Sequence, residues 1–259
     1  MTHVEINGSG PTVEALHLAA VQGFGHYTSM QVRGRAVAGL DLHLSRLREA
    51  SAELFPDDLA PSDETIVALI GRALRDERDA SVRVTVLPGA DVMVSVGEPA
   101  PRVPRPPLRV RTVRYERDLP HLKHCGTLAL SHHALQARRA GFDDVLFIGH
   151  GGLVLEGSVW NAVFWDGDRV VWPRAPMLAG ITMRALRRTM TDMGVPQIEL
   201  PVPLSGTTGL TAAAATNSHF PDQAIQTIDE IDFPAYGHLT ALLRRVWDEV
   251  PWQPIPPVH

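Results

Sequence analysis

Residues 140–165, AGFDDVLFIGHGGLVLEGSVWNAVFW, hold three short apolar runs: DDVLFI, LVLE and VWNAVFW. Apolar runs of this length, separated by glycines, predict strands. A hairpin turn is expected at Asp166-Gly167-Asp168, and the return strand RVVW ends at Pro173. This stretch therefore predicts a sheet.

Apolar periodicity predicts helices and strands on both sides of that stretch. The predicted helices cover residues 44–54, 62–74, 128–140 and 182–193, and the predicted strands cover residues 26–32, 81–87, 91–97 and 108–116. Between them, PAPRVPRPP (99–107) is too rich in proline for a helix or a sheet interior and predicts a linker. We therefore expect an α/β fold with two domains, residues 1–103 and residues 104–259.

The composition excludes several classes of protein. With 259 residues, 44% hydrophobic composition and a net charge of -5, the chain is globular and carries no basic patch for nucleic acid. Cys125 stands alone, so no disulfide is expected, and the twelve histidines complete no metal-ligand pattern. The sequence shows no signal peptide and no long apolar window. We expect a cytoplasmic protein without a membrane or nucleic-acid partner.

Lys123 is the only lysine among 24 basic residues. Lysine and arginine serve equally at most exposed positions, so a genome rich in G and C explains the imbalance. A primary amine that loses its proton and adds to a carbonyl is, however, something that arginine cannot supply. Lys123 is therefore a candidate for covalent chemistry, with an exposed surface lysine as the alternative.

Glu156 and Gly180-Ile181-Thr182 follow Lys123 along the chain. An amine, a carboxylate that holds a ring nitrogen protonated, and a helix N-terminus that binds phosphate are what pyridoxal phosphate needs. Each feature also has an ordinary explanation, since Glu156 could be a hairpin-edge carboxylate and the glycine a plain helix cap. Their order along one chain favours the cofactor site.

The chain resembles the fold-type IV, or class IV, pyridoxal-phosphate enzymes, which include branched-chain aminotransferases, D-amino acid aminotransferases and aminodeoxychorismate lyases. Five blocks carry the resemblance, in the family's order: LDLHLSRLREAS (40–51), HLKH (121–124), AGFDDVLFIGHGGLVLEGSVWNAVF (140–164), LAGITMRAL (178–186) and ATNSHFPDQAIQTID (215–229). The resemblance implies a small N-terminal α/β domain, a larger C-terminal α/β pseudo-barrel domain, pyridoxal phosphate as cofactor and a homodimer.

The resemblance also implies a role for individual residues. Lys123 would form the Schiff base and shuttle the proton, and Glu156 would partner the ring nitrogen. The other cofactor contacts would be Arg46, Gly180, Ile181, Thr182 and Thr216 at the phosphate, Leu178 on the ring face and Asn161 in the strand beside the cofactor. Tyr27, Thr28 and Trp160 are candidates for the substrate pocket. Arg46 could equally be a solvated helix arginine, and Leu178 a core residue.

Three features depart from the family's pattern. Thr127 and Leu128 occupy the stretch where branched-chain aminotransferases usually carry a tyrosine, and Trp160 stands where a small residue is common. Tyr27 is followed by Thr28 rather than by glutamate, which looks more like the lyase branch. The resemblance favours an aminotransferase acting on an amino acid or related amine and a 2-oxo acid. It leaves a pyruvate-releasing lyase as the alternative and an inactive binding protein as a weaker one.

Overall fold

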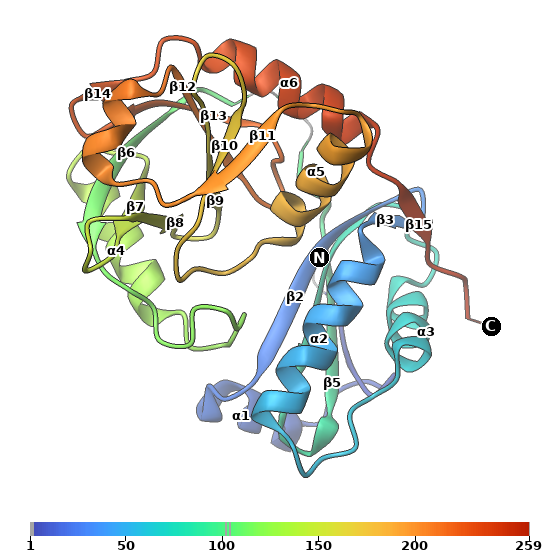
Figure 1. The fold of residues 1–259 in the computed structure, drawn as a ribbon. Coiled ribbons are helices and arrows are strands. Elements are labelled where there is room, and N and C mark those ends of the chain that lie inside the picture. Colours follow the sequence, from blue (N-terminus) through green and yellow to red (C-terminus); the bar gives the residue numbers. More distant parts are fainter. Residues whose placement is uncertain (1–2, 102, 104, 259) are drawn as a thin grey trace. The chain divides into compact units, whose positions relative to one another are not determined.

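The computed structural model of the protein describes residues 3–101, 103 and 105–258 (Figure 1). Its contacts divide the chain into two compact units. The first unit comprises Met1–Arg102, Leu122–Gly126 and Pro251–His259, and the second comprises Val103–His121 and Thr127–Val250. The boundary predicted between residues 103 and 104 involves Pro104, which lies outside the described residues. The division also differs from a single cut there, because residues 122–126 and 251–259 join the first unit.

The first unit is built on an antiparallel six-stranded sheet in the order β1-β5-β4-β2-β3-β15 (Figure 1). Its strands are β1 (His3–Ile6), β2 (His26–Arg33), β3 (Ala36–Ala38), β4 (Ala80–Val86), β5 (Val92–Gly97) and β15 (Trp252–Pro254), with a 3-10 turn at Pro88–Ala90 between β4 and β5. Buried and partly exposed residues alternate along β5, as expected for a strand with one face on a core. The proline-rich C-terminal segment supplies β15, which pairs with β3.

Three helices accompany this sheet: α1 (Val13–Gln22), α2 (Leu40–Leu54) and α3 (Asp63–Leu74). Helix α3 begins where the sequence predicts, because the Ser62 side chain accepts a hydrogen bond from Thr65 N. The buried faces of α2 and α3 share one hydrophobic core with β2, β4 and β5. Helix α1, which the periodicity does not predict, leaves Val13, Leu18 and Val21 exposed.

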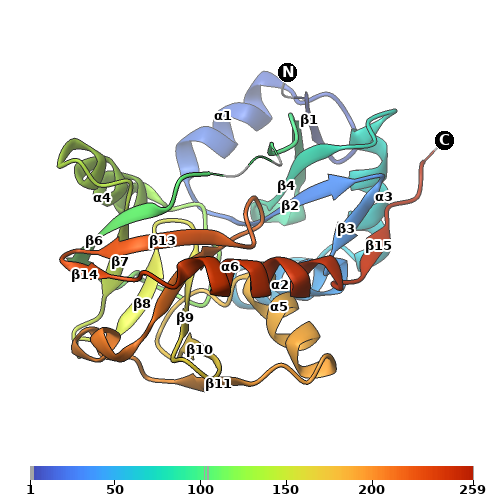
Figure 2. The same ribbon diagram turned by 90° about the horizontal axis from the view of Figure 1, so that it is seen from above.

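The second unit contains a mixed nine-stranded sheet (Figures 1 and 2). Its strands are β6 (Leu108–Arg114), β7 (Asp144–Ile148), β8 (Val154–Gly157), β9 (Asn161–Trp165), β10 (Val170–Pro173), β11 (Gln197–Leu200), β12 (Ala212–Thr216), β13 (Gln223–Ile228) and β14 (Ile231–Asp232), with a 3-10 segment at Leu204–Gly209. An additional pairing of β8 with β9 closes β9-β12-β13-β6-β7-β8 into a ring. This closure confirms the expected α/β fold with a barrel-like sheet.

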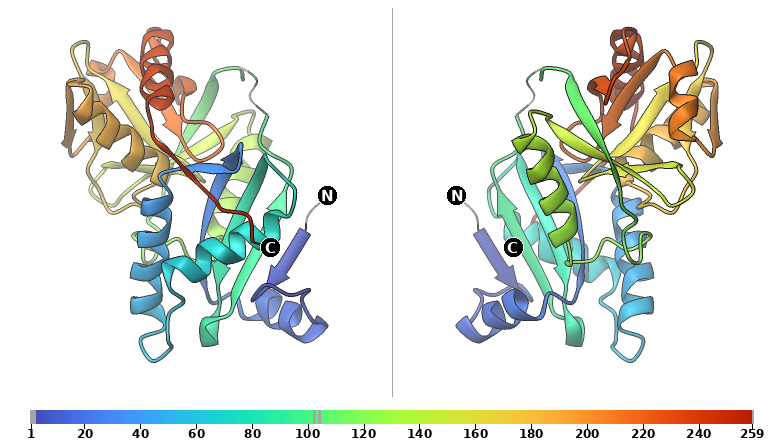
Figure 3. Two further views of the ribbon diagram at one scale, coloured as in Figure 1. Left: turned by 90° about the vertical axis from the view of Figure 1, so that its right-hand side faces the viewer. Right: turned by 90° about the vertical axis from the view of Figure 1, so that its left-hand side faces the viewer.

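The ring is covered on its outside by three helices: α4 (Leu128–Arg139), α5 (Ile181–Asp192) and α6 (Tyr236–Asp248). Figure 3 shows α4 alongside β6 and β7, in agreement with the core that α4 shares with β7. Alternate residues of β9 and β12 belong to different cores, since Val163 and Ala214 pack with α5 and α6 while Phe164 and Ala215 pack inside the ring. Among the described residues, no helix has the length and apolar composition needed to cross a bilayer.

His26, at the start of β2, is fully buried, with its Nε2 atom 2.9 Å from the Ser51 hydroxyl of α2. Burial lowers the pKa of His26 from 6.5 to about 4. Above pH 6.5 the imidazole is neutral in the folded and unfolded chains alike. Between about pH 6.5 and 4 only the unfolded chain takes up the proton, so the free energy of unfolding falls as the pH decreases, by up to about 3 kcal/mol.

Urea unfolding at pH 7.5, 5.5 and 4.5 measures this loss. A His26→Gln variant lacks the titrating group, so we expect its stability to fall less across the same pH range. Equal losses in the variant and the wild type would show that His26 does not titrate as its burial requires.

Candidate active site

Lys123 lies in a segment that joins the first unit beside β2. Tyr27 N donates a hydrogen bond to Lys123 O, and Cys125 N donates one to Gly25 O, each at 2.9 Å. The Lys123 Nζ atom lies 4.9 Å from the centre of the Tyr27 ring, and the Arg83 guanidinium carbon lies 3.6 Å from the same centre. The segment therefore holds an amine and a guanidinium against one aromatic ring.

Cys125, the other candidate nucleophile in this segment, is half-buried. Burial raises the pKa of its thiol, and the nearby Arg83 offsets part of that increase. Because the thiolate is the nucleophilic form, a raised pKa makes the Cys125 thiol a poor nucleophile near neutral pH. Lys123 is the better candidate for covalent chemistry.

The other predicted site residues of the first unit lie on β2 and α2. Tyr27 carries the ring just described, and it is 9% exposed. Thr28 is fully buried, with its Oγ1 atom 2.6 Å from His43 Nδ1, so its hydroxyl ties β2 to α2. Arg46 lies on the buried face of α2 and is 8% exposed, which is unusual for a helix arginine without a structural or binding role.

Glu156, Asn161 and Thr216 form a row across three neighbouring strands of the second unit. Asn161 of β9 is the register partner of Glu156 in β8 and of Thr216 in β12. All three side chains are buried, and the Thr216 hydroxyl has no hydrogen-bond partner among the described residues. Because burying a hydroxyl without a partner costs stability, Thr216 is a candidate contact for a bound polar group.

Glu156 also has a charged neighbour that the sequence did not single out. Arg117 Nη2 lies 3.4 Å from Glu156 Oε1, both side chains are largely buried, and the same nitrogen donates to Pro120 O at 2.6 Å. The guanidinium, which is always protonated, compensates the burial of the carboxylate. Arginine is so common in this chain that no sequence signal separates Arg117 from the rest.

The N-terminus of α5 lies beside the same row. Asn161 Nδ2 donates to Leu178 O at 2.7 Å and so holds the segment that leads into the helix. Gly180 is the N-cap and has no side chain to accept hydrogen bonds from the first turn, which contains Ile181 and Thr182. A helix N-terminus of this kind binds anions, because its first N–H groups point outward and the helix dipole is positive there.

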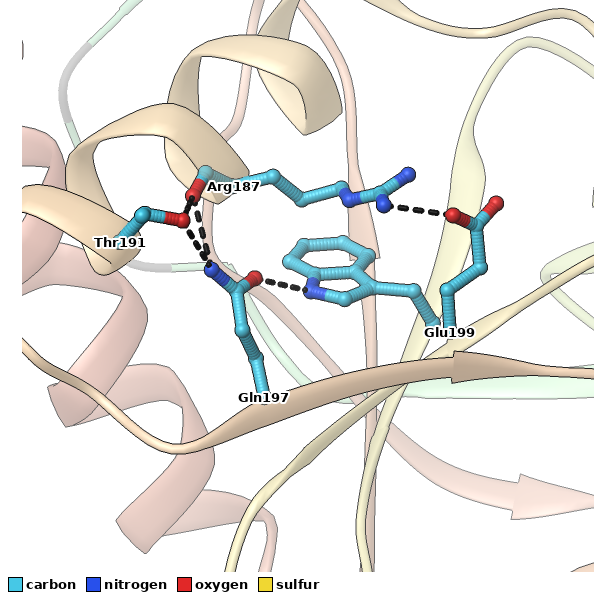
Figure 4. Close-up of polar contacts among 5 residues, drawn as sticks. Arg187, Thr191, Gln197 and Glu199 are labelled. Atoms are coloured by element: carbon cyan, nitrogen blue, oxygen red, sulfur yellow. Dashed lines mark hydrogen bonds and ion pairs between the residues drawn. The ribbon is translucent and has the colours of Figure 1, made fainter.

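A polar network near the other end of α5 fixes the helix to the sheet (Figure 4). Gln197 of β11 accepts a hydrogen bond from Trp172 Nε1 at 2.9 Å and donates to Arg187 O at 2.8 Å and to Thr191 Oγ1 at 3.0 Å. Arg187 forms an ion pair with Glu199 at 2.6 Å. The network holds α5 against β10 and β11, and thereby positions the helix N-terminus.

Gly180 itself has no room for a side chain. A Cβ atom built there would lie 2.0 Å from Asn161 Oδ1. Gly180→Ala should therefore push Asn161 away from Leu178 and lower the free energy of unfolding by about 1–3 kcal/mol, a typical cost of overpacking. Urea unfolding measures the change. The matched control is Gly151→Ala, since a Cβ at Gly151 meets nothing within 4 Å, and equal stabilities of the two variants would contradict the packing described.

The remaining two predicted residues, Leu178 and Trp160, are buried in the second unit. Leu178 precedes the cap of α5, next to the Asn161 contact. The Trp160 indole packs on Gly157, and its Nε1 donates to Asp144 Oδ2 at 2.9 Å. Trp160 thus lies in the core of the ring, which accounts for a large side chain at a position where the family often has a small one.

The residues present fit pyridoxal phosphate. The second unit offers an anion-binding helix N-terminus, a buried carboxylate and a buried hydroxyl without a partner, and the first unit offers the primary amine. These are the groups that a phosphate, a pyridine nitrogen and an aldehyde require. In the part of the chain that the structure describes, no three His, Cys, Asp or Glu side chains gather as metal ligands.

Comparisons with known proteins agree with this chemistry. A family model described as Amino-transferase class IV matches residues 25–225. A branched-chain amino acid aminotransferase from Escherichia coli has a TM-score of 0.82 at 16% identity, over 96% of this chain and 94% of its own. A hypothetical aminotransferase from Mycobacterium tuberculosis, in its apo form, has a TM-score of 0.80 at 19% identity, over 96% and 98%. A fold IV transaminase from Curtobacterium pusillum has a TM-score of 0.76 at 24% identity, over 90% and 88%. No curated protein sequence matches the chain.

Proposed function

This chain belongs to the class IV aminotransferases, a family that uses pyridoxal phosphate, and we propose that it transfers an amino group from an amino acid or related amine to a 2-oxo acid. The observation that carries the proposal is the buried row of Glu156, Asn161 and Thr216 beside the N-terminus of α5. The next residues on the same face of β9 and β12, Val163 and Ala214, are apolar and pack with α5 and α6.

Each residue has a defined task in this proposal. The bound cofactor supplies an aldehyde and an electron sink for the substrate. Lys123 Nζ would hold the cofactor covalently, and its amine would carry the proton from and to the substrate α-carbon. Glu156, compensated by Arg117, presents a negative charge to the ring nitrogen. The first turn of α5 and Thr216 would hold the phosphate, and the family resemblance assigns Arg46 to the same group.

Absorbance and product assays test the proposal. Purified protein mixed with pyridoxal phosphate should turn yellow, and amino donors supplied with 2-oxoglutarate or pyruvate should yield the corresponding new amino acid. If the protein binds no pyridoxal phosphate, the proposed amino transfer is excluded, and the inactive binding protein remains as the alternative. Binding without amino transfer to either acceptor would exclude the proposed reaction for the donors supplied.

The lyase alternative predicts pyruvate release from aminodeoxychorismate, which a coupled assay measures. Its support in the sequence is the hydroxyl residue after Tyr27. In the structure that residue, Thr28, is fully buried and bonded to His43, so a structural role accounts for it. We therefore leave Thr28 out of the proposed substrate contacts and keep Tyr27, whose ring stacks on Arg83 and faces the Lys123 amine.

We also infer a homodimer, which the family resemblance implies. Helix α1 supports it, because Val13, Leu18 and Val21 are 79, 52 and 68% exposed on a single short helix. An apolar surface of this kind is typical of one that a second chain covers. Light scattering should give twice the 28.3 kDa of one chain, and the mass of one chain at micromolar concentration would contradict the inference.

A further inference from the structure

We propose that Asp144 is a positioning residue of the cofactor site. Its carboxylate fastens the turn between β8 and β9, and through that turn it sets the place of Glu156. The inference rests on the proposed role of Glu156 as the partner of the ring nitrogen.

The turn matters because the closure of the ring is sparse at this point. Strands β8 and β9 share one register pair, Glu156 with Asn161, whereas β9 and β12 share five. A ladder with a single pair does little to fix the separation of its two side chains. The placement of Glu156 beside Asn161 therefore depends on residues 157–160, which join the two strands.

Residues 157–160 form a compact turn that a backbone hydrogen bond and the packing of Trp160 on Gly157 hold together. Gly157 N donates to Trp160 O at 2.8 Å, which brings the two ends of the turn together. A Cβ atom on Gly157 would lie 1.9 Å from the Trp160 ring, so the indole occupies the space that any larger residue would need. Gly157 is also the last residue of β8 and pairs with Leu146 of β7, so the sheet holds the first residue of the turn, whereas Ser158 and Trp160 lie in no strand and need another anchor.

Asp144 supplies that anchor. Its Oδ2 atom accepts hydrogen bonds from Ser158 Oγ and from Trp160 Nε1, each at 2.9 Å. Its Oδ1 atom accepts one from Val145 N at 2.8 Å. The Asp144 backbone pairs with Val110 at the start of the parallel ladder between β7 and β6. One carboxylate on an established strand thus holds two side chains of the turn.

Burial makes this anchor consequential. Ser158 and Trp160 are 7 and 5% exposed, so without the carboxylate a buried hydroxyl and a buried indole N–H would lose their acceptor. Hydrogen bonds to an ionised acceptor are also stronger than neutral ones. Removing the carboxylate should loosen the turn, and Glu156, the residue before it, should lose its fixed position. Groups that act on a bound ligand need placement within about 0.5 Å.

A double-mutant cycle tests the inference. The dissociation constant of pyridoxal phosphate, from absorbance titration, and the turnover number are measured for Asp144→Ala in the wild-type and in the Glu156→Gln background. If Asp144 acts through Glu156, the first background should show a roughly tenfold weaker affinity and a roughly tenfold lower turnover, and the second less than about a twofold change in either. Asp143→Ala is the matched control. It removes a neighbouring carboxylate that accepts a hydrogen bond from Arg109 N at 2.7 Å, and it should change neither quantity.

Equal losses in both backgrounds would overturn the inference, because they would show a general structural effect. So would an Asp144→Ala protein that behaves like the wild type. Should Asp144→Ala fail to fold, Asp144→Asn replaces it in the same cycle, since the amide keeps one acceptor oxygen and the shape of the side chain. A wild-type protein that binds no pyridoxal phosphate overturns the proposed function itself, whereas normal binding without coupling overturns only the role of Asp144.

Discussion

Replacing Lys123 with alanine should lower the turnover number of amino transfer by about 10⁴-fold, the range expected when a positioned base is lost. Lys123 is the only lysine in the chain, so no neighbouring amine of the same kind can take over its covalent and proton-transfer tasks. Steady-state assays with the best amino donor measure the loss. The yellow absorbance of the protein with its cofactor should disappear in the same variant.

Lys123→Arg is the control that separates chemistry from charge. Arginine keeps a positive charge near the Tyr27 ring, where Lys123 Nζ lies 4.9 Å from the ring centre. It cannot release its proton near neutral pH. We therefore expect the arginine variant to lose as much activity as the alanine variant while unfolding at the same urea concentration as the wild type. Substantial activity in the arginine variant would mean that Lys123 acts through its charge alone.

Glu156→Gln should lower the turnover number by about 10²–10³-fold, which is typical of losing one preorganised electrostatic contact. Glutamine preserves the size of the side chain but carries no charge, so the ring nitrogen loses its anionic partner. Arg117, 3.4 Å from the carboxylate, is then left buried without its counter-charge. Cofactor binding through Lys123 should persist, and absorbance titration with a parallel activity assay measures both quantities.

The matched control for this change is Glu116→Gln, which alters a partly exposed carboxylate paired with the exposed His150. It should leave the turnover number within about twofold of the wild type, because pairs of exposed charges contribute little. Equal activities of Glu156→Gln and Glu116→Gln would contradict the assignment of Glu156 to the ring nitrogen.

The α/β fold class could be predicted because several segments carry strong local signals. The apolar periodicity of α2 and the Ser62 cap of α3 are properties of the sequence itself. Strand β12, AAAAT, carries no such signal, since alanine is the best helix former. It forms a strand because β9 and β13 pair with its two edges, while its faces pack in the core of the ring and against α5 and α6. Helix α1 was not predicted for another reason. It has no single buried face, so its apolar residues do not show the regular spacing that indicates a helix.

Some residues of the candidate site could likewise be predicted from the sequence, and others could not. Lys123 could be singled out from the sequence because one primary amine among many guanidiniums is conspicuous. Arg117 and Asp144 could not, because arginine and aspartate are ordinary surface residues until the fold places Arg117 beside Glu156 and Asp144 beside the 157–160 turn. A role that depends on a partner distant in the sequence becomes visible only with the three-dimensional contacts.

Reduction of the protein with borohydride in the presence of pyridoxal phosphate, followed by mass-spectrometric mapping, tests the central claim most directly. The chain has one lysine, so the only other primary amine is the α-amino group of its first residue. We predict a stable phosphopyridoxyl adduct on the peptide that contains Lys123. An unmodified Lys123 peptide, or an adduct confined to the α-amino group, would contradict the account.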